Sequence, residues 1–304
     1  MNELAPVLIF TYNRPEHTRR LLESLSANEL ADKSHVVIYS DAPREEADNV
    51  LVAKTRRIIH ETKGFGKIDI IERRNNMGLA NSIIDGVSEW VNRCGRVIVL
   101  EDDLIVAPHF LRFMNDALTV YADEPRVGHI QACDFTQDPS LPDLFLIKWT
   151  GSWGWGTWSR AWRLFNPDGA DLLRQIEERG LSREFDFGGK YPYTRMLKRQ
   201  VEGKNNSWAI RWNATLFLAD MLSLNVGRSL VANRGFDGTG TNCGGGDLYQ
   251  SVLYDGVLPV DKIEPIIENK AARQVLASHY ARTNSFIAKA IRRIRRTLRG
   301  DFGA

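Results

Sequence analysis

The chain has 304 residues, 43% hydrophobic and 26% charged, which is ordinary for a globular protein and allows one large domain or two packed subdomains. No apolar run approaches the roughly 20 residues that span a bilayer, and we expect no secretory signal at the N-terminus. Cys94, Cys133 and Cys243 are odd in number and widely spaced, which disfavours a disulfide framework or a cysteine zinc site.

Charge is distributed unevenly along the chain. The formal net charge is +2, but nine of the 40 basic residues and one of the 38 acidic residues lie from Lys270 onward. The preceding residues therefore hold 31 basic against 37 acidic groups and are mildly acidic, whereas the tail is strongly basic. This asymmetry predicts an anionic partner for the tail and not for the whole protein.

Strand-like and helix-like segments alternate in the first part of the chain. Amphipathic segments separate the apolar runs, and the first of them begins at Pro15, with Asn13 as a candidate helix cap. This β-α-β-α order predicts an α/β fold with a mostly parallel sheet and helices on both faces. The predicted strands are residues 6–11, 35–40, 68–71 and 96–100.

Polar clusters follow three of these strands, at residues 11–14, 40–41 and 101–103. In open α/β sheets, ligands bind beyond the carboxyl ends of the strands. The shared location of the three clusters therefore predicts one binding site at that edge of the sheet.

The most informative cluster is Glu101-Asp102-Asp103, which ends the fourth predicted strand. Three adjacent carboxylates repel one another, and a divalent cation would relieve that repulsion. Hard oxygen ligands suit Mn²⁺ or Mg²⁺, which can bridge to a diphosphate and neutralise charge on a departing nucleoside diphosphate. The alternative is a solvated acidic turn before a helix.

The second part of the chain, from about residue 126, is rich in tryptophan, glycine and asparagine. Aromatic rings beside glycines can present flat surfaces to the apolar faces of sugars. A sugar-binding wall is therefore predicted, with core packing as the alternative reading of the same rings. Its members would be Trp153, Gly154, Trp155 and Trp158.

Two further segments suggest interactions. The glycine-rich stretch 235–247 could close over a diphosphate through its backbone N–H groups, or be a surface loop. Residues 284–299 combine an apolar face with flanking arginines, the pattern of a helix lying on an anionic membrane surface. The alternatives for this helix are packing on the body and, least favoured, nucleic-acid binding.

Four segments carry a resemblance to known families. The stretch 99–110 around the acidic triplet resembles the donor site of the N-acetylglucosaminyltransferase I family. Residues 7–14 and 74–80 resemble the wider GT-A glycosyltransferases, and residues 151–162 resemble bacterial sugar transferases of surface-polysaccharide pathways. The likeness is good over about residues 5–125, patchy from 126 to 245 and absent from the tail.

The resemblance implies a GT-A (Rossmann-like) fold with an acceptor-binding region and a C-terminal amphipathic helix. It divides the chain into a nucleotide-sugar-binding subdomain (1–125), an acceptor-binding and catalytic subdomain (126–270) and a basic amphipathic tail (271–304). The implied location is the cytoplasm, peripheral to the inner face of the cell membrane.

The resemblance also implies roles for individual residues. Asp103 would ligate Mn²⁺ or Mg²⁺, Asp102 would contact the ribose or the metal, and Glu101 would lie near the donor sugar or uridine. Asp41 would accept a hydrogen bond from the uracil. The remaining donor-site residues would be Thr11, Tyr12, Arg14, Arg74, Asn75 and Gly78.

The sequence departs from the family at the catalytic base. An inverting transferase needs a carboxylate to deprotonate the acceptor hydroxyl, but the matching stretch 207–212 contains no acid. Asp186 and Asp237 are the candidates, with Asp186 ahead, and retention of configuration remains open.

The resulting hypothesis is a metal-dependent, inverting transferase that moves a sugar from a UDP-sugar, first UDP-N-acetylglucosamine, to a glycan or lipid-linked acceptor of surface polysaccharide. One alternative is a sugar nucleotidyltransferase, although residues 11–15 are not its glycine-rich phosphate loop. Another is a binding protein that kept the fold and lost catalysis.

Overall fold

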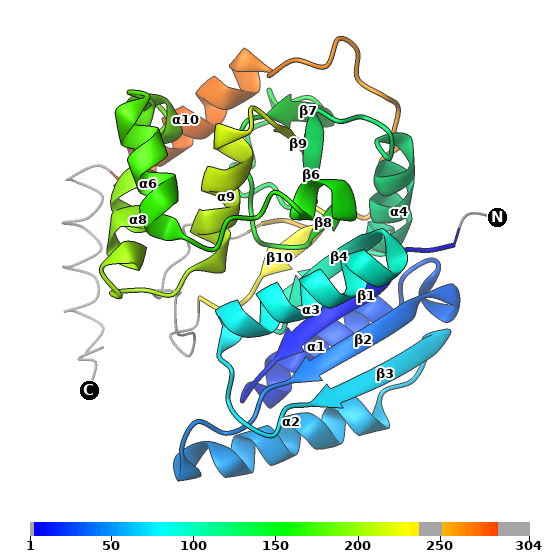
Figure 1. Cartoon of the computed structure of the whole chain (residues 1–304). Coiled ribbons are helices and arrows are strands. Elements are labelled where there is room, and N and C mark those ends of the chain that lie inside the picture. Colours follow the sequence, from blue (N-terminus) through cyan, green and yellow to red (C-terminus); the bar gives the residue numbers. More distant parts are fainter. Residues whose placement is uncertain (1–2, 237–250, 285–304) are drawn as a thin grey trace, which may run out of the picture.

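An eight-stranded mixed sheet runs through the computed structural model, which describes residues 3–236 and 251–284 (Figure 1). Its strand order is β3-β2-β1-β4-β8-β6-β9-β7, and β5 and β10 form a separate antiparallel pair. The strands are β1 (Val7–Thr11), β2 (His35–Ser40), β3 (Lys67–Glu72), β4 (Arg96–Glu101), β5 (Leu104–Val106), β6 (Val127–Gln131), β7 (Leu144–Ile147), β8 (Trp155–Trp158), β9 (Leu222–Val226) and β10 (Val231–Asn233).

Helices cover both faces of this sheet, as predicted (Figure 1). They are α1 (Pro15–Ser26), α2 (Asn49–Glu61), α3 (Leu79–Cys94), α4 (Phe110–Val120), α5 (Ser159–Trp162), α6 (Gly169–Glu178), α7 (Ser182–Phe185), α8 (Tyr193–Val201), α9 (Trp208–Leu218) and α10 (Lys270–Asn284). Short 3₁₀ turns lie at Ala31–Lys33 and Glu46–Asp48.

The four predicted strands are confirmed as β1 to β4, and they pair in parallel. Pro15 is the first residue of α1, also as predicted. Asn13 is not its cap, because the N-cap position belongs to Arg14 and makes no side-chain hydrogen bond there. The Asn13 amide instead donates to Asp48 Oδ1 over 2.8 Å.

Alternation along the strands separates two apolar cores. Val7 and Ile9 of β1 face the layer of α1, α2 and α4, whereas Leu8 and Phe10 face α3, α5 and α9. Successive side chains of a strand point to opposite faces, so a strand buried on both sides must be apolar throughout. This explains why β1, β2 and β4 read as continuous apolar runs.

The sheet continues across the predicted subdomain boundary near residue 125. Strand β8 pairs antiparallel with β4 on one side and with β6 on the other. Gly154 leads into β8 with a φ of +65°, and a Cβ there would lie 2.5 Å from Val231 Cγ2. A glycine is therefore required where this segment passes β10.

A third core lies under α6 to α10. Ala272, Leu276 and Tyr280 of α10 pack into it, so residues 270–284 are joined to the second half of the chain. The predicted membrane-surface helix at 284–299 lies outside the described residues, except for Asn284. Within residues 3–236 and 251–284, no helix combines the length and apolar character needed to cross a membrane.

His129 is a buried titratable group in the middle of β6. Its Nδ1 accepts a hydrogen bond from Trp212 Nε1 at 3.1 Å, and burial lowers the pKa of the imidazole to about 3. The unfolded chain takes up a proton below about pH 6.5, but the folded chain does not until about pH 3. Folding free energy from this group is thus lost as the pH falls through that window.

We expect His129→Asn, which keeps an acceptor for Trp212, to flatten the pH dependence of stability. Denaturant unfolding between pH 6.5 and 4 should show the wild type losing up to about 1.4 kcal/mol per pH unit more than the variant. Equal slopes for the two proteins would contradict this account of His129.

Candidate active site

The acidic motif lies where predicted, at the carboxyl ends of the central strands. Asp102 and Asp103 follow β4, Arg14 follows β1, and these two strands are neighbours. Arg14 Nη1 lies 2.9 Å from Asp103 Oδ2 and 3.7 Å from Asp102 Oδ1. The backbone N–H of Tyr12 donates to Asp102 Oδ2 over 3.3 Å. Parallel pairing therefore brings two clusters 90 residues apart into contact.

The three acids are held close together in a poorly solvated place. Burial, with added repulsion from Asp103, raises the pKa of Asp102 to about 7, and Arg14 only partly offsets this. Burial and the same neighbours raise the pKa of Glu101 well above its usual value. Ionising all three acids is therefore unfavourable, because Arg14 supplies only one positive charge beside them, and this environment favours binding of a cation.

Asp103 also provides an unsatisfied ligand atom. Its Oδ1 is buried and has no hydrogen-bond partner among the described residues. The same part of the chain contains no group of three or more histidine, cysteine or acidic side chains arranged to hold a metal. The residues thus fit an ion such as Mg²⁺ or Mn²⁺ that takes one or two carboxylates from the protein and its other ligands from phosphate and water.

Gly235 packs directly on the Asp103 carboxylate. A Cβ at this position would lie 2.1 Å from Asp103 Oδ2, so no larger residue fits without moving the acid. The Gly235 N–H donates to Asn233 Oδ1 over 2.7 Å, and Arg234 N donates to the Asp103 carbonyl over 2.8 Å. The segment after β10 therefore restricts the position of Asp103 together with Arg14.

The other predicted donor residues lie along the same edge. Asp41 accepts from the backbone N–H groups of Ala42, Met77 and Gly78 at 2.8–2.9 Å, so it anchors the loop that precedes α3. Each carboxylate oxygen can accept more than one hydrogen bond, so Asp41 keeps acceptor capacity for a ligand. The contact of Asp41 with uracil stays a prediction. Arg74 and Asn75 are exposed in that loop.

Thr11 and Tyr12 have structural partners. Thr11 Oγ1 is buried and donates to the Tyr39 carbonyl over 3.0 Å, and the Tyr12 hydroxyl donates to Asp48 Oδ2 over 2.5 Å. These bonds hold the segment that carries Arg14 toward the acids. Direct contact of either side chain with a nucleotide stays a prediction.

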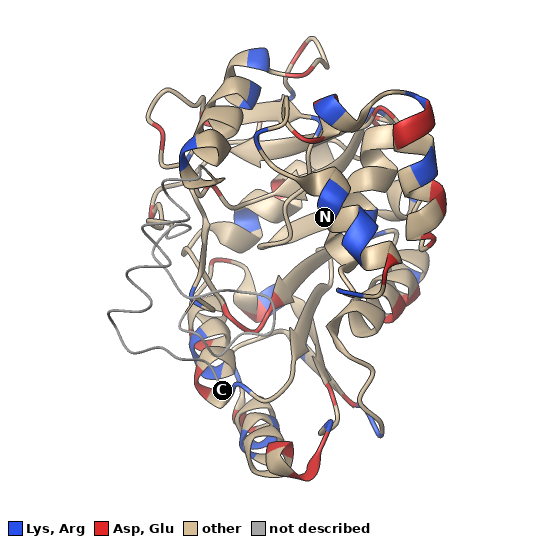
Figure 2. Cartoon of the chain, turned by 90° about the vertical axis from the view of Figure 1, so that its left-hand side faces the viewer, with Lys and Arg blue, Asp and Glu red and all other residues tan. Residues whose placement is uncertain are grey.

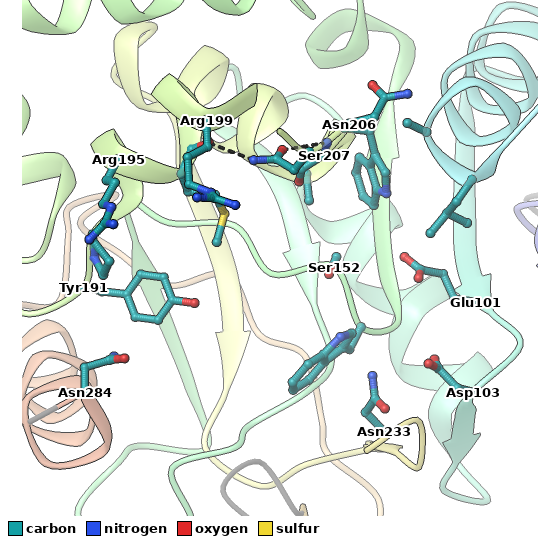
Figure 3. Close-up of a pocket in the computed structure, with 18 residues that line it drawn as sticks. Glu101, Asp103, Ser152, Tyr191, Arg195, Arg199, Asn206, Ser207, Asn233 and Asn284 are labelled. Atoms are coloured by element: carbon teal, nitrogen blue, oxygen red, sulfur yellow. Dashed lines mark hydrogen bonds between the residues drawn. The ribbon is translucent and has the colours of Figure 1, made fainter. Parts of the chain in front are cut away.

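A cavity of about 570 Å³ opens beside the acidic motif (Figure 3). This is within the range of small-molecule sites. Glu101 and Asp103 point into it from one wall, and Tyr191, Arg195 and Arg199 stand on the opposite wall. The remaining lining residues are Leu79, Ala80, Ser152, Trp153, Pro192, Met196, Asn205, Asn206, Ser207, Trp208, Ala209, Asn233 and Asn284.

Of the four residues of the predicted sugar wall, only Trp153 lines this cavity. Trp155 is fully buried and stacks on Trp208 with ring centroids 5.0 Å apart. Trp158 is buried on the other face and donates to the Leu118 carbonyl over 3.0 Å. The sequence interpretation is corrected here, because Trp155 and Trp158, the first and last residues of β8, fill the two cores, and Gly154 serves packing.

Of the two candidate bases, Asp186 belongs to the described residues and Asp237 does not. Asp186 does not line the cavity, and its Oδ1 accepts from Thr194 N at 2.7 Å and Thr194 Oγ1 at 2.9 Å. Burial raises the pKa of Asp186, while these hydrogen bonds oppose the rise. The side chain therefore holds the start of α8. Asp237 and most of the glycine-rich segment lie outside the described residues.

The sequence pattern does not identify the cavity residues of α8 or the segment before α9. Arg195 and Arg199 are spaced one helical turn apart beside the buried residues Tyr193 and Leu197. This spacing indicates a polar helix face, but the residues that face it come from β4 and β10. Only the tertiary structure shows that this helix face and the ends of β4 and β10 line the same cavity.

Comparisons with known proteins agree with this geometry. Residues 7–133 match the model of glycosyl transferase family 2. No curated protein matches the chain. The fold and the site define a glycosyltransferase with the GT-A fold that uses a nucleotide sugar. The matched residues 7–133 cover less than half of the chain; the narrower likeness to the N-acetylglucosaminyltransferase I family stays a prediction.

Several solved structures are distantly similar. S. aureus TarS has 16% identity, a TM-score of 0.29 and coverage of 46% of this chain and 23% of its own. The mannosyltransferase PcManGT from Pyrobaculum calidifontis, in complex with GDP-Man and Mn²⁺, has 13% identity, a TM-score of 0.38 and coverage of 72% and 75%. Mouse xyloside xylosyltransferase 1 has 10% identity, a TM-score of 0.37 and coverage of 71% of this chain and 81% of its own. Similarity this low says nothing about this chain's substrates.

We expect Gly235→Ala to weaken nucleotide binding by at least tenfold, because the new Cβ displaces the Asp103 carboxylate from Arg14. Calorimetric titration of UDP with Mn²⁺ measures the effect, and the unfolding temperature checks that the fold is kept. Wild-type affinity in a folded variant would show that the position of this carboxylate is unimportant.

Proposed function

We propose that the protein transfers a sugar from a UDP-sugar, with UDP-N-acetylglucosamine as the first candidate, to a glycan or lipid-linked oligosaccharide of surface polysaccharide. The reaction is inverting and depends on Mn²⁺ or Mg²⁺. The observation that carries this proposal is the acidic edge of β4, which faces Arg14 and opens into the 570 Å³ cavity. The choice of UDP, of the sugar and of the pathway rests on the sequence resemblance.

Asp103, with Asp102 beside it, would hold the metal ion. When bound, the ion neutralises negative charge on the leaving diphosphate. Arg14 supplies a second positive charge at the same place. Gly235 and the backbone N–H of Tyr12 keep the carboxylates oriented, so the protein binds the diphosphate with groups that are already in position.

Glu101 is the base that the geometry favours. Within the described residues, the carboxylates that line the cavity are those of Glu101 and Asp103, and Asp103 is paired with Arg14. Glu101 would accept the proton of the acceptor hydroxyl as its oxygen bonds to the anomeric carbon and the bond to the diphosphate breaks. Asp237, outside the described residues, remains the alternative.

Membrane association is part of the same proposal. Residues 284–299 carry the apolar and arginine pattern of an interfacial helix, and a lipid-linked acceptor would require the protein to work at a membrane surface. This step rests on the sequence alone.

A binding protein without catalysis is the second candidate. It is favoured by residues 207–212, the stretch that matches the acid-bearing segment of the resembled family and contains no acid here. Hydrolysis of the donor by the purified protein would exclude it.

We expect Asp103→Asn to abolish Mn²⁺-dependent binding of UDP, because it removes the carboxylate that pairs with Arg14 and ligates the metal. Titration calorimetry with UDP, and with GDP and CDP for comparison, measures the loss. Asp123→Asn, an equal loss of charge at an exposed position away from the cavity, is the matched control and should bind normally. Failure of the wild type to bind any of the three nucleotides would overturn the proposal.

We expect Glu101→Gln to lower kcat by about 10²–10⁴-fold with little change in UDP affinity, as for loss of a general base. Asp186→Asn should leave kcat within a few-fold, since its carboxylate serves Thr194. Donor turnover assays on both variants measure these effects. The opposite ranking would return the role of base to Asp186.

A further inference from the structure

The cavity has opposite charges on its two walls. Glu101 and Asp103 occupy the wall formed by β4 and the segment after it, and Arg195 and Arg199 project from α8 on the other (Figure 3). On the face that Figure 2 presents, basic and acidic residues are interspersed. The arginine pair is thus a local feature of the cavity, and it has no role in the function proposed so far.

The orientation of α8 is fixed by its buried face. Tyr193 and Leu197 are buried, and the Tyr193 hydroxyl accepts from Trp149 Nε1 at 2.7 Å and lies 2.9 Å from the Tyr280 hydroxyl. Residues four apart share a helix face, so Arg195 and Arg199 project together on the side away from this anchor. The helix therefore presents two guanidinium groups to the cavity as a unit.

Neither guanidinium forms an ion pair with another described residue, although several other helical arginines do. Arg174, for example, pairs with Asp171 and Glu178. Glu202, the acid directly after α8, accepts a hydrogen bond from Lys204 at 2.7 Å. This bond is the main cause of the lowered pKa of Glu202, and Arg199 contributes less. Both arginines are therefore available to an anion that enters the cavity.

We propose that the acceptor carries an anionic group, a phosphate or a carboxylate, which Arg195 and Arg199 bind while the donor diphosphate lies at the Asp103 wall. This inference rests on the proposed transferase function and specifies its acceptor class. A planar guanidinium matches both anions with paired hydrogen bonds. Tyr191 lies beside the arginines, where it can contact the sugar that bears the charge.

The test uses the full chain saturated with UDP and Mn²⁺, so that the donor site is filled. Glucose 1-phosphate, glucuronic acid and neutral glucose are titrated in turn by calorimetry. At least one charged probe should bind ten or more times as tightly as glucose. The preferred probe distinguishes a phosphate from a carboxylate.

The double variant Arg195→Gln/Arg199→Gln should bind the charged probes no better than glucose, with UDP affinity and unfolding temperature unchanged. Lys198→Gln is the matched control, since Lys198 is exposed on the same helix but does not line the cavity. It should retain the preference for a charged probe.

Three results would overturn the inference. One is equal binding of charged and neutral probes by the wild type. Another is the same loss in Lys198→Gln, which would show a general charge effect. The third is weaker UDP binding by the double variant, which would move the arginines to the donor diphosphate. Absence of UDP binding by the wild type would instead count against the transferase function itself.

Discussion

The ion pair between Arg14 and Asp103 connects the two strand ends that form the proposed donor site. It joins the ends of β1 and β4, two neighbouring parallel strands that are apolar along their length because helices cover both faces. Three consecutive acids at a buried strand end would repel one another, and Arg14 offsets only part of that repulsion. A divalent cation, bound as proposed, would offset the rest of that repulsion, and the buried Oδ1 of Asp103 would be a ligand for it.

The second half of the chain gives this edge its cavity. Strand β8 continues the sheet beyond β4 and delivers Trp155 and Trp158 to opposite cores, which locks the two halves together. The rings that follow Trp153 are therefore structural, and the walls of the cavity come from α8, the start of α9 and the end of β10. A rigid junction of this kind holds the acidic wall and the arginine wall in a fixed relation, which a transferase needs because donor and acceptor must meet in one geometry.

The sequence predicts the parallel half of the fold and the acidic edge because both depend on local patterns. Apolar runs buried on both faces are unambiguous when amphipathic helices alternate with them, and parallel strands necessarily place their polar ends together. The rest depends on contacts between distant segments. Nothing local distinguishes a tryptophan that fills a core, as Trp155 does, from one that lines a cavity, as Trp153 does. Asp186 has a carboxylate that could act as a base, and the sequence does not show that this carboxylate is held by Thr194 at the start of α8.

The position of Glu101 links the departure from the resembled family to the chemistry of this chain. Residues 207–212, which match the acid-bearing segment of that family, contain no acid, and Ser207 accepts from Ile210 N at 3.2 Å to cap α9. A serine hydroxyl does not take up a proton at neutral pH. The cavity nevertheless contains a carboxylate, because Glu101 is the last residue of β4 and points inward (Figure 3). Under the proposed function, Glu101, which precedes Asp102 and Asp103, would receive the proton, with Asp237 as the alternative.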